Sequence, residues 1–519
     1  GSHHRGPGVR AGMQTFHEAV GAVETFSPAE EQFNRRRRTA GLFLAPAVFL
    51  ILLFAPFDLP VLAHRMAAIM GLVITLWITE ALPLAITAIL GPCLAVGFGI
   101  TTGRAALAPF ADPIIFLFIG GFMLAQAMFV HGVDRRVAYG ALAMPGVGSS
   151  ATRIFLVYGG VCTALSMWIS NTATTAMMFP IGLSIIAHLS RTSANKAQVR
   201  RYALAMMLIT SFGASIGGMS TPVGTPPNLI GIGMLEKIVG QRISFFSWMA
   251  IGVPIVAMLF AYLVTQFYFS SVRGFVIAEG SIDLVHRELE RLGKPTAGQR
   301  NVLLAFAVTI LLWIAPGVMA IAGADETAFA QGYAAHMPEG VAAMIGACLL
   351  FVLPVNWRER RFTLTWDEAV KIDWGITLLY GGGLALGEMS FSTGLAQAIG
   401  EGVTNWLPSQ SALALTLLFT GAAIVVSEAA SNTASANMIV PIAIAVSQAA
   451  GVRPIEPVLG ATLGASMGFM MPVSTAPNAI VYSSGHVPIG QMMRHGFFLD
   501  AAAFIIIVST VMLLGPILF

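Results

Sequence analysis

The long apolar stretches that recur along the whole chain constrain the fold more than any other feature. They include residues 41–57, 66–78, 302–321, 340–353 and 499–518, some of them shortened by polar flanks. Runs of about 18 or more apolar residues are typical of helices that cross a bilayer. Only 10% of the 519 residues are charged, whereas a soluble domain has about a quarter. The sequence therefore predicts an all-α polytopic membrane protein with about 11 transmembrane helices.

The basic residues lie between the apolar stretches and indicate how the chain is oriented. The motif NRRRR at residues 34–38 precedes the first apolar stretch, and the polar stretch 271–301 holds five Lys or Arg residues. Because cytoplasmic segments are enriched in Lys and Arg, we expect both to lie in the cytoplasm. The sequence thus predicts an integral protein of a bacterial-type cytoplasmic (inner) membrane with a cytoplasmic N-terminus, and the loop-bound charge indicates no nucleic-acid partner.

The polar stretch also divides the chain into four predicted regions. Residues 1–39 contain a tag remnant, GSHHRGPGVRAG, and a cytoplasmic N-terminal segment. Residues 40–270 form a first half and residues 302–519 a second half. Residues 271–301 form the cytoplasmic linker between them, with an amphipathic helix expected around IDLVHRELERLG.

The two halves repeat one another in sequence. The tetrapeptide SNTA occurs at residues 170–173 and again at residues 431–434, 261 positions later, and Asp112 and Asp373 share this spacing. The heptapeptides PVGTPPN (222–228) and PVSTAPN (472–478) form a further pair, 250 positions apart. Several motifs at a nearly constant offset indicate an internal duplication.

The connection between the two motifs differs in charge between the halves. The first half has the basic segment RTSANKAQVRR at residues 191–201, whereas the equivalent residues 451–456 include one basic residue. This difference predicts that the two halves lie in opposite orientations in the membrane. Inverted repeats with interrupted helices are the architecture of many secondary transporters.

The polar motifs interrupt apolar segments with residues that begin helices. Asn171 or Thr172 is a suitable N-cap for a helix that begins near Ala173. Thr225 precedes a proline that fits a first helical turn, and Thr475 has the same place in the second half. Free N–H groups at such helix starts suit a carboxylate. The preceding carbonyls, with Ser and Asn oxygens, suit a hard cation such as sodium.

The apolar segments that carry the motifs offer no compensating positive charge of their own. Residues 161–190, 202–236, 411–452 and 454–493 contain no Lys or Arg. A helix dipole supplies only about half a charge, so a dianion buried there would be costly. The pattern therefore favours joint binding of cations and an anion.

Four acidic residues lie in or beside the apolar segments. Glu80 and Glu428 are candidates for a function because of their position in the membrane. A structural role, such as accepting hydrogen bonds from nearby backbone, is an equal alternative for both. Asp112 and Asp373 each precede an apolar run, and we expect them to be N-caps.

These motifs resemble those of the divalent anion/sodium symporter family, the INDY-type di- and tricarboxylate transporters. The resemblance begins at about Ala40 and includes WITEALPLAITAILGP, LSMWISNTATTAMMFPIG, YGGGLALGEM, SEAASNTASANMIVPIA and MPVSTAPNAIVY. It implies two re-entrant hairpins with Ser-Asn-Thr tips and two helices that unwind at the proline turns. It also implies a homodimer in which a transport domain moves like an elevator against scaffold helices.

The resemblance further implies what is carried and which residues bind it. The substrate is expected to be a C4-dicarboxylate of the succinate, fumarate or malate type, with citrate and sulfate as open alternatives, carried together with sodium ions. The substrate would be bound by Ser170, Asn171, Thr172, Thr225, Ser431, Asn432, Thr433 and Thr475. One sodium site would use Ser166, Ser170, Asn171 and the Gly224 carbonyl, and a second would use Ser427, Ala430, Asn432 and Ser474, partly through backbone carbonyls. No organic cofactor and no catalytic residue is expected.

Two other functions compete with sodium-coupled symport. Ser474 and Ala476 stand where members of the family often have Ala and Pro, a change at the second cation site or the pocket wall. Because some members exchange anions without sodium, a sodium-independent dicarboxylate exchanger is the first alternative. The second is a membrane-embedded hydrolase using Ser170 or Ser431. It would need a general base beside the serine, and neither motif has a His or Lys near it in sequence, since His188 lies at a predicted helix end.

Overall fold

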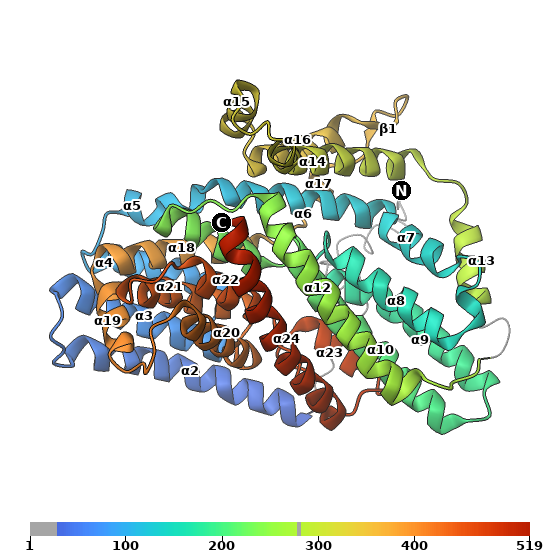
Figure 1. Cartoon of the computed structure of the whole chain (residues 1–519), viewed down its shortest axis with the longest axis horizontal. Coiled ribbons are helices and arrows are strands. Elements are labelled where there is room, and N and C mark those ends of the chain that lie inside the picture. Colours follow the sequence, from blue (N-terminus) through green and yellow to red (C-terminus); the bar gives the residue numbers. More distant parts are fainter. Residues whose placement is uncertain (1–27, 278–281) are drawn as a thin grey trace, which may run out of the picture.

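The computed structural model of the protein describes residues 28–277 and 282–519. The predicted tag remnant lies outside the described residues. The described chain is almost entirely helical (Figure 1), which confirms the all-α prediction. The strands within it are β1 (Pro354–Asn356) and β2 (Arg361–Phe362), which form a small antiparallel ribbon.

The helices follow one another through short connections. Those before the predicted linker helix are α2 (Pro28–Phe54), α3 (Val61–Thr79), α4 (Leu84–Gly97), α5 (Gly103–Leu107), η1 (Ala108–Ala111), α6 (Pro113–His131), α7 (Val133–Leu142), η2 (Val147–Ser149), α8 (Ala151–Ser166), α9 (Asn171–Thr192), α10 (Lys196–Gly217), η3 (Gly218–Ser220), α11 (Pro226–Met234), η4 (Leu235–Val239), α12 (Phe245–Phe267) and η5 (Tyr268–Val272). The remainder are α13 (Asp283–Leu292), α14 (Ala297–Ile321), α15 (Ala328–His336), α16 (Glu339–Val352), α17 (Trp366–Ala369), α18 (Trp374–Ser392), α19 (Leu395–Thr404), α20 (Ala412–Ala429), α21 (Asn432–Ala449), α22 (Ile455–Gly464), α23 (Ala476–Tyr482) and α24 (Ile489–Leu518).

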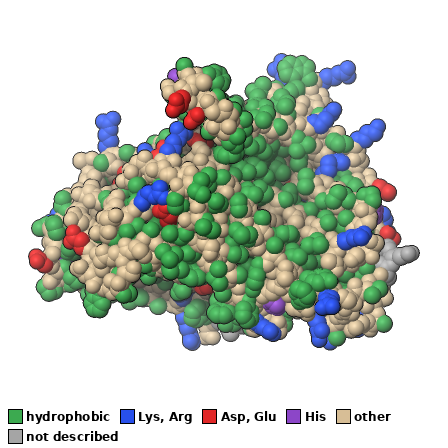
Figure 2. All heavy atoms as spheres, in the orientation of Figure 1, with side chains coloured by type: hydrophobic (Ala, Val, Ile, Leu, Met, Phe, Trp, Pro, Cys, Tyr) green, Lys and Arg blue, Asp and Glu red, His purple; other side chains and the backbone are tan. Residues whose placement is uncertain are grey.

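The apolar helices account for the expected membrane spans. Nine helices of the described residues are long and apolar enough to cross a membrane, or ten if the bent pair α15 and α16 is one span. The expected number was about 11. The apolar helices α4 and α8, with 14 and 16 residues, fall short of a span. Figure 2 shows apolar side chains over the middle of one face and Lys and Arg mainly near its margins, as expected of a protein surrounded by lipid.

The elements that carry the repeated motifs pack across the halves. α8 and α9 form a hairpin whose turn holds the first Ser-Asn-Thr motif, and α20 and α21 form a hairpin with the second. α10 and α11 are separated by the first proline turn, and α22 and α23 by the second. α11 packs against α21, while α23 packs against α9. Each interrupted helix therefore lies against the hairpin of the other half.

The linker contains the amphipathic helix that the sequence predicts. This helix, α13, packs against α7. Arg136 of α7 donates hydrogen bonds of 2.9 Å to the carbonyl oxygens of Leu292 and Gly293, at the C-terminal end of α13. A cation is favourable there because the carbonyl groups at the end of a helix carry partial negative charge.

Candidate functional site

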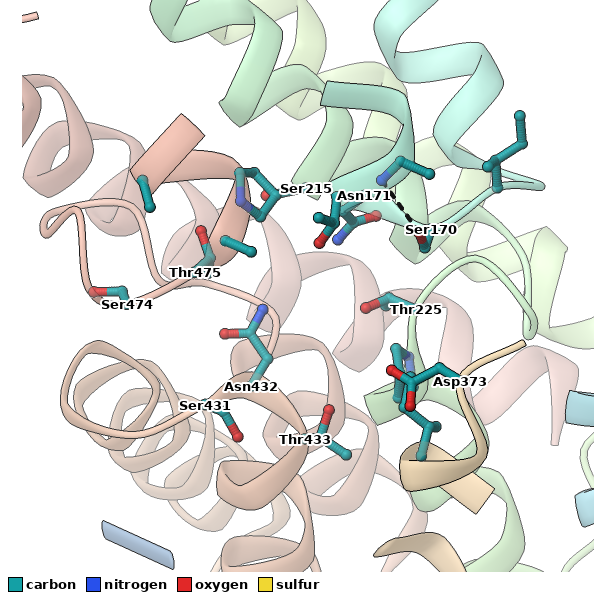
Figure 3. Close-up of a pocket in the computed structure, with 18 of the residues that line it drawn as sticks. Ser170, Asn171, Ser215, Thr225, Asp373, Ser431, Asn432, Thr433, Ser474 and Thr475 are labelled. Atoms are coloured by element: carbon teal, nitrogen blue, oxygen red, sulfur yellow. Dashed lines mark hydrogen bonds between the residues drawn. The ribbon is translucent and has the colours of Figure 1, made fainter. Parts of the chain in front are cut away.

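A cavity of about 630 Å³ lies where the two hairpins and the two interrupted helices meet. All eight residues that the sequence assigns to substrate binding line it: Ser170, Asn171, Thr172, Thr225, Ser431, Asn432, Thr433 and Thr475. Figure 3 shows that Ser170 and Asn171 approach this space from one side, while Ser431, Asn432 and Thr433 approach it from another. The structure thus brings residues of both halves together around one cavity.

The hairpin tips are built in the same way in both halves. The Ser170 hydroxyl accepts a 3.2 Å hydrogen bond from the Ala173 amide, and the Ser431 hydroxyl accepts one of 3.2 Å from the Ala434 amide. These serines are therefore the N-caps, and the helices begin at Asn171 and Asn432. The prediction that Asn171 or Thr172 caps the helix is wrong, because the serine hydroxyl already reaches the third amide of the helix.

The asparagine that follows each cap turns back toward the preceding helix. The buried Ser166 hydroxyl donates a 2.8 Å hydrogen bond to Asn171 Oδ1. In the second half the buried Ser427 hydroxyl donates one of 2.7 Å to Asn432 Oδ1. Each tip is thus closed by a Ser–Asn hydrogen bond that leaves several oxygen atoms close together.

Two glycines show how tightly these oxygens converge. A Cβ at Gly218 would collide with Asn171 Oδ1 and lie 3.1 Å from the Gly224 carbonyl oxygen. A Cβ at Gly468 would lie 3.1 Å from the Ser427 carbonyl oxygen and 3.3 Å from Asn432 Oδ1. Gly218 and Gly468 are 250 positions apart, so this oxygen-lined space also occurs once in each half. Oxygen ligands without a His or Cys suit a hard cation such as sodium.

The interrupted helices are held open by equivalent asparagines. The Asn228 side-chain amide donates to the carbonyl oxygens of Gly218, at 2.9 Å, and Thr221, at 2.8 Å. The Asn478 amide donates likewise to Gly468, at 2.9 Å, and to Met471, at 3.0 Å. Carbonyl groups left unpaired by the break are thereby satisfied inside the protein, as a membrane interior requires.

The helices after the two breaks begin where the sequence predicts. Thr225 and Thr475 are the N-caps, and Pro226 and Ala476 are the first helical residues. The Thr475 hydroxyl accepts a 3.3 Å hydrogen bond from the backbone amide of Asn478. Within the described part of the chain the Thr225 side chain makes no such capping bond, and Figure 3 shows it at the cavity.

The residues assigned to sodium binding fall into two groups. Those on the cavity wall are Ser170, Asn171, Gly224, Asn432 and Ser474, and those buried behind it are Ser166, Ser427 and Ala430. The Ser474 hydroxyl donates to the Glu428 carboxylate at 2.7 Å and to the Glu428 carbonyl at 3.2 Å. The carbonyl oxygen of Ser474 is the atom left for the predicted sodium site.

Glu428, Asp112 and Asp373 all make structural contacts. For Glu428 the sequence left such a role open as an alternative, and for Asp112 and Asp373 it predicted N-caps. Glu428 Oε1 accepts hydrogen bonds from the amides of Phe469, at 2.7 Å, and Met470, at 3.0 Å. Asp112 and Asp373 are N-caps, as predicted, and accept from the Ile114 and Gly375 amides, respectively, at 2.9 and 3.0 Å.

Three basic residues at the cavity were not assigned to the site from the sequence. Arg37, Arg38 and Lys371 line it, from α2 and from the turn before α18. Arg37 and Arg38 lie 3.1 and 3.4 Å from Glu80 Oε2, and Arg37 Nη1 donates to the Ala429 carbonyl at 3.4 Å. The sequence signal for Arg37 and Arg38 is the NRRRR motif, which on its own indicates only orientation.

Ser215 of α10 is a further polar residue at the cavity that the sequence did not identify. Its side chain is 1% exposed, and its hydroxyl has no hydrogen-bond partner among the described residues. Figure 3 shows it near Asn171 and Thr475. Since a buried hydroxyl without a partner is costly, Ser215 is available to a bound ligand.

Comparison with known proteins identifies the family of this chain. The family model described as the sodium:sulfate symporter transmembrane region matches residues 36–519. The sodium-dependent dicarboxylate transporter SdcS of Staphylococcus aureus is 34% identical over 487 residues, which cover 92% of this chain and 91% of SdcS.

Two solved structures share the fold at low sequence identity. The YdaH transporter of Alcanivorax borkumensis is 12% identical, with a TM-score of 0.54 over 82% of this chain and 89% of YdaH. MtrF of Neisseria gonorrhoeae is 13% identical, with a TM-score of 0.50 over 81% of this chain and 83% of MtrF. At such identities the likeness concerns the fold alone.

The helical fold is that of a polytopic membrane protein. The family model describes symporters and the relative SdcS is named as a transporter, so the class is a membrane transporter rather than an enzyme. The chain belongs to the sodium:sulfate symporter family. This confirms the resemblance to the divalent anion/sodium symporters that the motifs indicated.

Proposed function

We propose that this protein is a secondary active transporter that moves C4-dicarboxylates, such as succinate, fumarate or malate, together with sodium ions. The observation that carries the proposal is the single cavity lined by both Ser-Asn-Thr motifs and both proline turns. The name of the relative SdcS, a sodium-dependent dicarboxylate transporter, supports the choice of substrate and ion.

In this proposal each half binds one end of the substrate. Hydroxyl and amide donors of Thr172 and Asn171 face one carboxylate, and those of Thr433 and Asn432 face the other. Hydrogen bonds to charged groups contribute about 1.5–3 kcal/mol each. The basic side chains of Arg37, Arg38 and Lys371 add positive potential at the cavity.

The two oxygen-lined spaces beside Gly218 and Gly468 are the proposed sodium sites. Ser166, Ser170, Asn171 and the Gly224 carbonyl would hold one ion, and Ser427, Ala430, Asn432 and the backbone of Ser474 the other. Bound sodium would offset the two negative charges of the substrate, which the helix dipoles alone do not.

The architecture inferred from the family belongs to the same proposal. Residues 40–270 and 302–519 would be inverted repeats joined by the linker 271–301, and the repeated contacts of the two hairpins support this. A homodimer in the cytoplasmic membrane, with its N-terminus in the cytoplasm, would carry the cavity across the bilayer by an elevator movement.

Counterflow in proteoliposomes tests the coupling directly. Full-length protein is reconstituted in vesicles loaded with succinate, and uptake of labelled succinate is measured in sodium and in choline buffer. Symport predicts that uptake requires sodium. Equal uptake in choline would instead support the sodium-independent exchanger. The hydroxyls of Ser170 and Ser431 act as helix caps, which disfavours the hydrolase alternative.

A further inference from the structure

Two buried serines hold equivalent positions in the two halves, one on each interrupted helix. Ser215 lies in the segment GASIG of α10, and Ser466 lies in the segment GASMG at the end of α22. A Cβ at Gly213 would meet three residues of α8, and one at Gly464 would meet three residues of α20, each 261 positions after its counterpart. Because each serine lies two residues after one of these glycines, the two serines correspond.

Both of these serines have a hydroxyl group without a hydrogen-bond partner among the described residues. Their side chains are 1% and 0% exposed. Buried hydroxyls in a helix commonly donate to the carbonyl oxygen four residues earlier, as those of Thr210 and Ser447 do at 2.7 Å. The hydroxyls of Ser215 and Ser466 do not, so both retain their capacity to donate and to accept a hydrogen bond.

The two serines differ in their relation to the cavity. Ser215 is one of the described residues that line it, whereas Ser466 is not. The eight residues assigned to the substrate form four pairs, with one member of each pair in either half. Ser215 thus adds a hydroxyl to the cavity wall of the first half that the second half does not match.

The place of Ser215 indicates which part of a substrate it would meet. In the view of Figure 3 it lies between Asn171 of the first half and Thr475 of the second. The proposed function has one carboxylate bound by each half, so Ser215 would lie beside the carbon atoms that join the two carboxylates. A neutral hydroxyl supplies no charge for a third carboxylate, but it can pair with another hydroxyl group.

We propose that Ser215 is a specificity-determining residue whose hydroxyl bonds the 2-hydroxyl group of a hydroxydicarboxylate such as malate. The inference rests on the proposed function, because it needs both carboxylates to be bound by the two halves. Succinate would leave Ser215 unpaired, and a site with an unpaired polar group discriminates against the substrate that leaves it so. Two carboxylate contacts and one hydroxyl contact fix three points, so the site should also distinguish the enantiomers of malate.

Equilibrium binding to the purified full-length protein at saturating sodium tests this role. Labelled succinate is bound and is then displaced by unlabelled succinate or by each enantiomer of malate. The wild type should bind one enantiomer more tightly than succinate. Ser215→Ala should weaken the binding of that enantiomer by about tenfold, since one hydrogen bond is lost, and should leave the affinity for succinate unchanged.

Ser466→Ala is the matched control, because it removes the equivalent buried hydroxyl at a position that does not line the cavity. All three affinities should be unchanged in this variant. If Ser215→Ala does not fold, Ser215→Cys decides the case, since a thiol is only a weak donor and acceptor. It should show the same selective loss.

Two results would overturn the role of Ser215 and leave the proposed function standing. One is a wild type that binds neither enantiomer more tightly than succinate. The other is a folded Ser215 variant in which the affinities for malate and succinate are both unchanged or fall equally. A wild type that binds no dicarboxylate would contradict the proposed function as well.

Discussion

The two halves of the cavity share a hydrogen-bond pattern but differ in charge. Both have a serine cap, a Ser–Asn bond behind it and an asparagine that satisfies the carbonyls of the break. The second half alone has a pair of neighbouring carboxyl groups, Glu428 with Asp500 of α24, and Met167 stands in the place of Glu428 in the first half. The shared contacts thus stabilise the hairpin tips and the helix breaks in both halves, whereas the two acids are present in the second half alone.

The largest expected effect concerns the asparagines that hold the breaks. Asn478→Ala leaves the carbonyls of Gly468 and Met471 without their donor, at about 1–3 kcal/mol per buried group. It also removes Asn478 Oδ1, which accepts a 2.6 Å hydrogen bond from the Ser211 hydroxyl. The equivalent atom of the first half, Asn228 Oδ1, accepts no hydrogen bond from the described residues. Thermal unfolding should show a larger loss for Asn478→Ala than for Asn228→Ala. Equal losses would remove this difference between the halves.

Asp134 gives a test of the comparison outside the cavity. Asp134 of the first half is matched by Ala396 of the second, because each lies two residues after a glycine with left-handed backbone, Gly132 and Gly394 respectively. Burial raises the pKa of Asp134 from 3.8 to about 6, partly opposed by its bond to the Arg135 amide.

The folded state therefore favours protonated Asp134. The contribution of Asp134 to the free energy of unfolding is fully present below about pH 4 and is lost as the pH rises through about 6. The size of this loss is at most about 3 kcal/mol. Stability measured against pH should show this loss in the wild type. In Asp134→Ala, which copies the second half, the loss should be absent. The same pH profile in both proteins would contradict the assignment of this loss of stability to Asp134.

The Ser–Asn pairs should control sodium affinity in both halves. Asn171→Ala and Asn432→Ala each remove one proposed ligand, and each should weaken the apparent sodium affinity by about tenfold, or about 1.4 kcal/mol. Sodium titration of binding to the purified protein measures this. Ser184→Ala on α9, away from the cavity, is the control. If only one asparagine matters, the two sites are not equivalent.

The smallest expected effect is that of Arg37, which donates a hydrogen bond to the second hairpin at the Ala429 carbonyl. Arg37→Gln should weaken succinate binding a few-fold, by about 1 kcal/mol or less, because the side chain is near the surface and already paired with Glu80. The effect should diminish as salt is raised. An effect that does not change with ionic strength would indicate a direct structural role instead.

Much of the site was predictable because it is encoded in local, repeated motifs. The helix starts at Thr225 and Thr475 follow from threonine followed by proline, and the N-caps Asp112 and Asp373 from their place before apolar runs. The exact cap at Ser170 was missed, since Ser, Asn and Thr in a row are all good caps.

The rest depends on contacts between distant segments. Arg37 reaches the cavity because α2 packs beside α3 and its arginines meet Glu80. Asp500 reaches Glu428 because α24 packs along α20. Neither contact is marked by a periodicity or a repeated spacing in the sequence, so hydropathy and motifs could not predict either one.

In the proposed function a single substrate molecule is bound by both halves together. Equilibrium binding of labelled succinate at saturating sodium, compared among the wild type, Thr172→Ala and Thr433→Ala, tests it most directly. Each variant should lose one hydrogen bond to a carboxylate and bind at least about tenfold more weakly, with unfolding temperatures near that of the wild type. Unchanged succinate affinity in either folded variant would contradict a site shared by the two halves.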